Sequence, residues 1–225
     1  ISGNVKTMMD AKMKGMIMAG MMAISLVLGA IAIFSNSWLT EEDEDNDDVT
    51  RNTGLSTYQI VDADHDSADE CDAMAKMVEE LFEDADAEAE CDGKVLTMNV
   101  GLSDWCEAAE DGGADDDDVD DCEAAASAGT MGQIGMWGGV VFALLATLMM
   151  VLPMAGVDAL DAIPEMGQKV ISWGAGGLML LGMVLWYFML PDGDSSMAMG
   201  CVMAGAAMSL ALGSTLIGQF IPADE

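Results

Sequence analysis

Four long stretches of this chain contain no charged residue, and each is long enough to cross a lipid bilayer as a helix. These stretches are residues 15–40, 124–157, 170–191 and 195–223. A helix of about 20 apolar residues spans the hydrocarbon core of a bilayer. The sequence therefore predicts a mainly α membrane protein, a four-transmembrane-helix bundle.

The segment between the first two apolar stretches is strongly acidic. Residues 35–130 contain 32 acidic side chains and only three basic ones, Arg51, Lys76 and Lys94, which gives a net charge of −29. The other 8 acidic and 4 basic residues contribute −4, which completes the total of −33. Such a segment repels nucleic acid and anionic lipid head groups and attracts cations and basic partners. We expect no nucleic-acid partner.

The lysines predict the orientation in the membrane. Lys6, Lys12 and Lys14 precede the first apolar stretch and Lys169 begins the third. Short loops rich in Lys or Arg stay in the cytoplasm. We expect a multi-pass plasma-membrane protein whose first helix is an uncleaved signal anchor. The predicted segments are a cytoplasmic N-terminus (1–14), helices at 15–37, 129–153, 169–190 and 196–220, an extracellular domain (38–128), a cytoplasmic loop (154–168), a short extracellular turn (191–195) and a cytoplasmic C-terminus (221–225).

Four of the five cysteines lie in the acidic segment: Cys71, Cys91, Cys106 and Cys122. An even number of cysteines in an oxidising compartment indicates disulfides, and four cysteines allow three connectivities. We favour the sequential pairs because each closes a short ring, worth about 3 kcal/mol of stability. A zinc site is the rival interpretation, but the spacing is unlike that of two CxxC knuckles. Cys201 is expected to be a buried thiol.

Local patterns predict a small disulfide-bonded α+β domain between the first two helices. Residues 54–61 and 94–102 are typical of strands, and the second alternates polar residues with Leu96, Met98 and Val100. Apolar residues at intervals of three and four predict an amphipathic helix over 69–90. Residues 41–48 are expected to be a solvated acidic strip, and residues 111–121 an acidic loop.

Small residues on two apolar stretches predict close helix contacts. Gly135 and Gly139 form a GxxxG pair, and Gly205, Ser209 and Gly213 recur at intervals of four. Small residues let helix backbones approach each other in lipid. The pattern leaves open whether these faces pack within one chain or between copies. Ionisable residues usually mark proton relays and ion pathways in membranes, so their absence from all four stretches argues against a pump.

Clustered carboxylates raise the question of calcium. Alternate acids could supply hard oxygen ligands for Ca²⁺, and the candidate set is Asp62, Asp64, Asp66 and Glu70. An EF-hand is rejected because its sixth and twelfth positions fall on Ser67 and Ala73 instead of Gly and Glu. Hydrated acids preceding a helix are the favoured interpretation. Methionine pairs spaced by four could bind Cu(I), yet methionine is also a common apolar filler.

The overall pattern resembles the claudin/PMP22-type superfamily of four-helix membrane proteins. Trp38 follows the first apolar stretch, and Gly101-Leu102-Ser103-Asp104-Trp105-Cys106 precedes Cys122. The resemblance implies a large first external loop folded as a small sheet, pinned by a Cys106–Cys122 bridge. It also implies that Trp38 and Trp105 pack at the membrane-facing base of this domain, and that the protein is a membrane scaffold.

These observations predict a protein that is not an enzyme. His65 is the only histidine, and no nucleophile has a recognisable neighbouring motif. We expect a structural or accessory subunit, or a cell-contact scaffold, that acts through its acidic extracellular domain. Its expected partners are membrane lipids, cations, and other membrane subunits or further copies of itself. The alternative is a cation-selective pore of several copies, in which the acidic domain concentrates cations.

Overall fold

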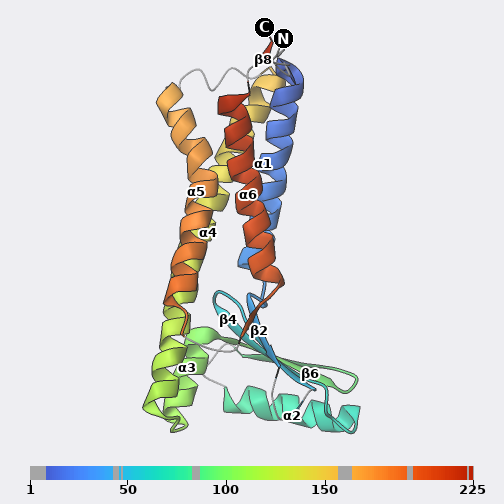
Figure 1. Cartoon of the computed structure of the whole chain (residues 1–225). Coiled ribbons are helices and arrows are strands. Elements are labelled where there is room, and N and C mark those ends of the chain that lie inside the picture. Colours follow the sequence, from blue (N-terminus) through green and yellow to red (C-terminus); the bar gives the residue numbers. More distant parts are fainter. Residues whose placement is uncertain are drawn as a thin grey trace, which may run out of the picture. The chain divides into compact units, whose positions relative to one another are not determined.

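Long apolar helices and one antiparallel sheet make up most of the chain in a computed structural model (Figure 1). The structure describes residues 9–42, 46, 48–82, 87–156, 164–191, 195–221 and 223–224. The chain divides into two compact units. We call Ile1–Ala30, Gly135–Leu181 and Met203–Glu225 the helix unit, and Ile31–Ile134 and Gly182–Val202 the sheet unit. Residues 1–8 of the predicted N-terminus, 157–163 of the predicted loop 154–168 and 192–194 of the predicted turn 191–195 lie outside the described residues.

In the described part of the chain, four helices are long and apolar enough to cross a membrane. They are α1 (Ala11–Ile33), α4 (Asp116–Met154), α5 (Glu165–Met189) and α6 (Met199–Phe220). The helix unit also holds a two-residue parallel pairing of β1 (Met9–Asp10) with β8 (Ala223–Asp224). The expectation of a mainly helical chain with four membrane-length helices is confirmed.

Hydroxyl groups join the helices of the helix unit through backbone carbonyls. Ser25 Oγ of α1 donates a hydrogen bond to the Ala207 carbonyl of α6 at 2.7 Å. In return, Ser214 Oγ of α6 donates to the Met18 carbonyl of α1 at 3.0 Å. Thr215 Oγ1 of α6 donates to a carbonyl of α5 at 2.9 Å. In an apolar environment these bonds satisfy buried hydroxyls and hold neighbouring helices together.

The sheet unit contains a six-stranded antiparallel sheet in the order β5-β6-β4-β3-β2-β7. Its strands are β2 (Leu39–Glu42), β3 (Val49–Thr53), β4 (Thr57–Asp62), β5 (Glu88–Asp92), β6 (Val95–Gly101) and β7 (Ser196–Met197). The two residues of β7 come from the connection between α5 and α6 and pair with Leu39 and Thr40 of β2. One segment distant in sequence therefore completes the edge of the sheet.

Helix α2 (Ala68–Leu81) covers one face of this sheet near β5 and β6 (Figure 1). Cys71 and Ala75 of α2 are buried against Ala89 and Leu96. Leu96, Met98 and Val100 alternate with less buried residues along β6, as the sequence predicts. A shorter helix, α3 (Leu102–Asp111), follows β6 directly.

The acid-rich segments correct two expectations. The helix predicted over 69–90 ends at Leu81, and residues 88–92 form strand β5 because they pair with β6. The loop predicted over 111–121 is wrong from Asp116 onward, where α4 begins. Three acids in the first turn of α4 suit the positive end of the helix dipole. Glu41 and Glu42 of the predicted acidic strip are exposed residues of strand β2, and residues 43–45 and 47 of that strip lie outside the described residues.

Candidate binding groove

Trp38 is the buried anchor of the segment that joins α1 to the sheet. Its side chain is completely buried, and its indole Nε1 donates a 2.7 Å hydrogen bond to the Ala32 carbonyl at the end of α1. The ring packs edge-to-face against Trp186 of α5, with centroids 5.0 Å apart. A satisfied indole N–H and an aromatic partner are what a buried tryptophan requires. Trp38 therefore fixes where the first strand starts.

The start of α6 packs directly against Trp38. The Ala198 N–H donates to the Trp38 carbonyl at 2.8 Å, and the Gly200 N–H donates to the Ser37 carbonyl at 2.7 Å. A methyl group on Gly200 would lie only 2.6 Å from Trp38 Cδ1. Glycine is needed here because the backbone of α6 touches the indole ring, which sets the position of β7 beside β2.

A row of amide side chains crosses the face of the sheet opposite α2. Asn99 Oδ1 accepts hydrogen bonds from Gln59 Nε2 at 2.9 Å and from Asn36 Nδ2 at 3.2 Å. Gln59 Oε1 accepts from Asn52 Nδ2 at 3.1 Å, and Asn52 Oδ1 accepts from Thr40 Oγ1 at 2.8 Å. These residues face one another because Thr40, Asn52, Gln59 and Asn99 are register partners. We call Asn36, Asn52, Gln59 and Asn99 the amide ladder.

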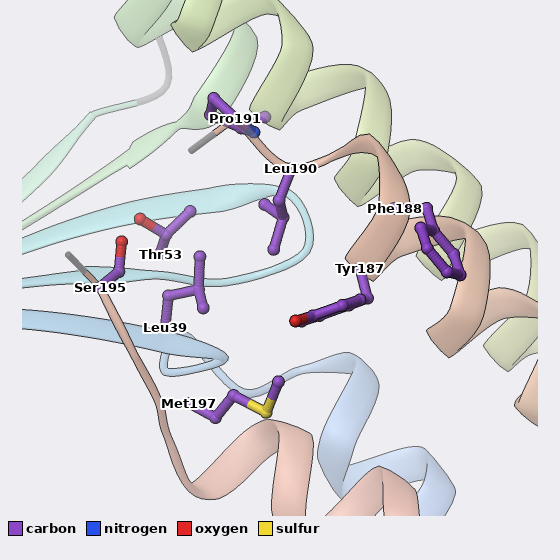
Figure 2. Close-up of a pocket in the computed structure, with 9 residues that line it drawn as sticks. Leu39, Thr53, Tyr187, Phe188, Leu190, Pro191, Ser195 and Met197 are labelled. Atoms are coloured by element: carbon purple, nitrogen blue, oxygen red, sulfur yellow. The ribbon is translucent and has the colours of Figure 1, made fainter. Parts of the chain in front are cut away.

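An open groove of about 540 Å³ lies in the sheet unit, beside the end of α5. Strands β2 and β3, helices α4 and α5 and the segment around β7 contribute its walls. The lining residues are Leu39, Thr53, Ala125, Tyr187, Phe188, Leu190, Pro191, Ser195 and Met197. Tyr187 and Leu190 point into the groove, with the Tyr187 hydroxyl directed toward Leu39, whereas Phe188 points away (Figure 2). The lining thus combines apolar side chains with a few hydroxyl groups.

A charged recess adjoins the groove through Leu39, Thr53 and Ser195, which line both. The recess also contains Glu41 and Arg51, whose Oε1 and Nη1 atoms lie 4.0 Å apart. Tyr58 lines the same recess. Burial raises the pKa of its phenol; the nearby Arg51 charge opposes this shift and Glu41 reinforces it. One end of the groove is therefore apolar and the other carries both signs of charge.

Two of the four candidate calcium residues, Asp62 and Glu70, accept hydrogen bonds from the local backbone. The Asp64 N–H donates to Asp62 Oδ1 at 2.9 Å, and the Asp66 N–H donates to Glu70 Oε2 at 3.1 Å. Ser67 caps α2 by accepting from the Glu70 N–H. Within the described ranges, no three His, Cys, Asp or Glu side chains are grouped as metal ligands.

His65 is buried rather than exposed. Its Nε2 lies 3.7 Å from Asp62 Oδ2, too far for a hydrogen bond, and has no hydrogen-bond partner among the residues that the structure describes. The chemistry of this position is therefore that of a packed imidazole beside one carboxylate.

Both disulfides join sequential cysteines, Cys71 to Cys91 and Cys106 to Cys122. The first ties α2 to β5 and the second ties α3 to α4. Cys201 is a buried thiol, as expected. The bridges therefore fasten helices onto a domain whose acidic side chains cannot supply a large apolar core.

The residues expected to pack helices occupy different environments. Gly135 and Gly139 of α4 are buried, and a methyl group on Gly139 would lie 2.8 Å from a carbonyl of α5. Ser209 of α6 is exposed, and its hydroxyl bonds to Gly205 of its own helix at 2.8 Å. A methyl group on Gly213 would lie 2.9 Å from a methionine of α1. The fully buried positions of α6 are instead Ala204, Ala207, Ala211 and Ser214.

No protein-family model, curated protein or solved structure matches this chain. The resemblance to claudin/PMP22-type proteins therefore stays a prediction. The two tryptophans of this resemblance have separate neighbours: Trp38 packs on Trp186, whereas Trp105 stacks with Tyr58 and with Phe82 at centroid distances of 4.8 and 6.0 Å.

The local sequence patterns do not predict the groove, although two aromatic residues near the end of the third apolar stretch, Tyr187 and Phe188, mark its position. Aromatic residues gather where apolar helices meet the membrane surface. The other walls come from residues as distant in sequence as Leu39 and Met197, which only the β2–β7 pairing brings together.

Proposed function

We propose that this chain is a non-enzymatic multi-pass membrane protein that acts as a structural or accessory subunit through its acidic domain. In this proposal the four apolar helices form a four-span bundle in the plasma membrane, with both termini in the cytoplasm. The sheet unit's acidic segment lies outside, where its two disulfides are stable. Lys6 before α1, Lys12 and Lys14 in its first turn and Lys169 near the start of α5 support this orientation.

The observation that carries the proposal is how the helix unit uses its buried polar groups. In the described helices, the buried side-chain hydroxyls belong to Ser25, Ser214 and Thr215, and all three donate to backbone carbonyls. Hydroxyls committed to the backbone hold helices together and offer nothing to a transported ion. The polarity within the helices thus favours a packing role over a transport path through one chain.

The acidic domain supports a role in recognition. The amide ladder, the Trp38 anchor and two disulfides hold the sheet unit together. A net charge of −29 over residues 35–130 favours partners with basic surfaces. The contact-scaffold and accessory-subunit alternatives share this chemistry and differ in whether the partner is another copy or a different protein.

The test is the native mass and subunit composition of the full chain extracted in mild detergent. We expect a basic partner in fixed stoichiometry at 0.1 M salt. We also expect it to dissociate at 1 M, because the screening length falls from about 10 Å to about 3 Å. A monomer without partners at both salt concentrations would overturn the proposal.

A pure homo-oligomer would be consistent with a contact scaffold or with a cation pore, and a measurement of cation flux into liposomes distinguishes the two. Passage of cations would replace the scaffold role with the pore alternative. Failure of the same homo-oligomer to pass cations would support a contact scaffold. The calcium expectation needs a measurement of Ca²⁺ binding to the full chain. Asp62→Asn and Asp66→Asn should bind less Ca²⁺ than the unaltered chain if the site exists, and the same amount if it does not.

A further inference from the structure

We propose that the groove beside the end of α5 binds one phospholipid with a zwitterionic head group. The acyl chain would lie along the apolar wall, and the head group would lie over the recess that holds Arg51 and Glu41. This inference goes beyond the proposed subunit role, because it requires only that the four apolar helices lie in a bilayer.

The groove lies where one charge-free stretch of the chain ends and the next begins. The groove is lined by Tyr187, Leu190 and Pro191, the last residues of a charge-free stretch, and by Ser195, the first residue of the next one. Charge-free helices end where hydrocarbon gives way to head groups, and tyrosine is enriched there. Tyr187 is 56% exposed, with its ring and hydroxyl directed into the groove (Figure 2). The groove thus opens at the depth where lipids change from apolar to polar.

The lining changes from apolar to polar along the groove. Leu190 and Met197 form an apolar wall, and Met197 is 57% exposed on β7. Thr53 and Ser195 then add hydroxyls, and the adjoining recess adds a guanidinium and a carboxylate. The recess holds only about 20 Å³, so a head group would lie over its mouth. An amphiphile satisfies both ends, whereas a wholly apolar or wholly polar ligand satisfies only one.

The recess beside the groove carries one positive and one negative side chain. Arg51 Nη1 and Glu41 Oε1 lie 4.0 Å apart, and their side chains are 39% and 51% exposed. A guanidinium suits a phosphate and a carboxylate suits an ammonium group, so the pair matches the two charges of a zwitterionic head group. An anionic lipid would match Arg51 alone and would be repelled by the net charge of −29 in residues 35–130.

The experiment uses the full chain reconstituted in vesicles of phosphatidylcholine and phosphatidylglycerol in equal amounts. One lipid at a time carries a photoreactive diazirine in its acyl chain, and mass spectrometry locates the labelled peptides. We expect the phosphatidylcholine probe to label peptides containing residues 187–197 above the level found on the other apolar helix faces. The phosphatidylglycerol probe should label them less.

Groove-filling variants provide the decisive comparison. Ala125→Trp places an indole in the groove from α4 and should reduce labelling of residues 187–197 to the background of the other helices. Ser127→Trp adds the same side chain at an exposed position two residues along α4 and should leave labelling unchanged. Ser195→Trp fills the groove from the opposite rim, which keeps the test valid if Ala125→Trp does not fold.

Head-group recognition has its own variants. Arg51→Gln should lower phosphatidylcholine labelling about tenfold, because a lost hydrogen bond to a charged group is worth roughly 1.4 kcal/mol. Glu41→Gln should raise phosphatidylglycerol labelling relative to phosphatidylcholine. Equal labelling of the Ala125→Trp variant and the unaltered chain would overturn the proposal.

Discussion

Replacing Trp38 should destabilise the sheet unit by an amount set by its burial and its two partners. The indole is completely buried, so Trp38→Ala should cost about 3–5 kcal/mol, the usual range for large-to-small substitutions of buried aromatic residues. Trp38→Phe keeps an aromatic ring and loses the hydrogen bond to Ala32, worth about 1 kcal/mol. In Trp38→Phe the Ala32 carbonyl still accepts a hydrogen bond from the Ser35 N–H at 3.3 Å. The substitution therefore carries no added cost for a buried acceptor left without a hydrogen bond.

The contact between Trp38 and Trp186 can be measured separately by a double-mutant cycle. Centroids 5.0 Å apart in an edge-to-face arrangement predict a coupling of about 0.5–1.5 kcal/mol between the two alanine substitutions. The assay is equilibrium unfolding of the detergent-solubilised full chain, followed by circular dichroism. Trp173→Phe is the matched control, because this side chain is 40% exposed and its substitution should change stability by less than about 0.5 kcal/mol.

Two results would refute this reasoning. If Trp38→Phe changes stability no more than Trp173→Phe, the hydrogen bond to α1 contributes nothing measurable. If the double-mutant coupling is zero within error, the two rings do not stabilise each other, and the position of α5 beside the sheet needs another explanation.

Three further predictions concern other elements. Replacing Cys71 and Cys91 together by Ala should lower stability by about 3 kcal/mol, since the bridge closes a separation of 20 residues, and a thermal melt unchanged from the oxidised chain would contradict this. The raised pKa of the Tyr58 phenol means that its contribution to stability is complete below about pH 10 and is lost as the pH rises further, so Tyr58→Phe should flatten the fall in melting temperature that calorimetry shows above about pH 10. Lys14→Met removes bonds of 2.9 and 2.6 Å to two carbonyls at the end of α6 and should cost about 1–2 kcal/mol in the same melts, whereas Lys14→Arg should recover part of the loss.

Apolar periodicity predicted the elements whose burial it controls. The four long helices follow from charge-free length, and β6 follows from the alternation of Leu96, Met98 and Val100. Sequential disulfides follow from short ring size. In each case the prediction depends on residues that are close together in the sequence.

Acid-rich elements were mispredicted because their structure depends on a partner strand or on a helix dipole. Residues 88–92 carry Glu88, Glu90 and Asp92, which indicate no strand by propensity, yet they pair with β6. Asp116 and its neighbours resemble a hydrated loop, but they occupy the first turn of α4. The groove was also beyond local patterns, because its walls come from segments that meet only in the folded chain.

Because β7 pairs with β2, the sheet cannot be completed until late in the synthesis of this protein. Ser196 Oγ donates to the Thr40 carbonyl across a separation of 156 residues. At a translation rate of about 5–20 residues per second, the ribosome needs roughly 8–31 s to reach Ser196 after Thr40. Until then β2 lacks its outer partner, and the Trp38 carbonyl lacks the Ala198 N–H. The sheet is thus finished only after α4 and α5 have been made, so a chain stalled before α6 would present an open strand edge that quality-control factors could recognise.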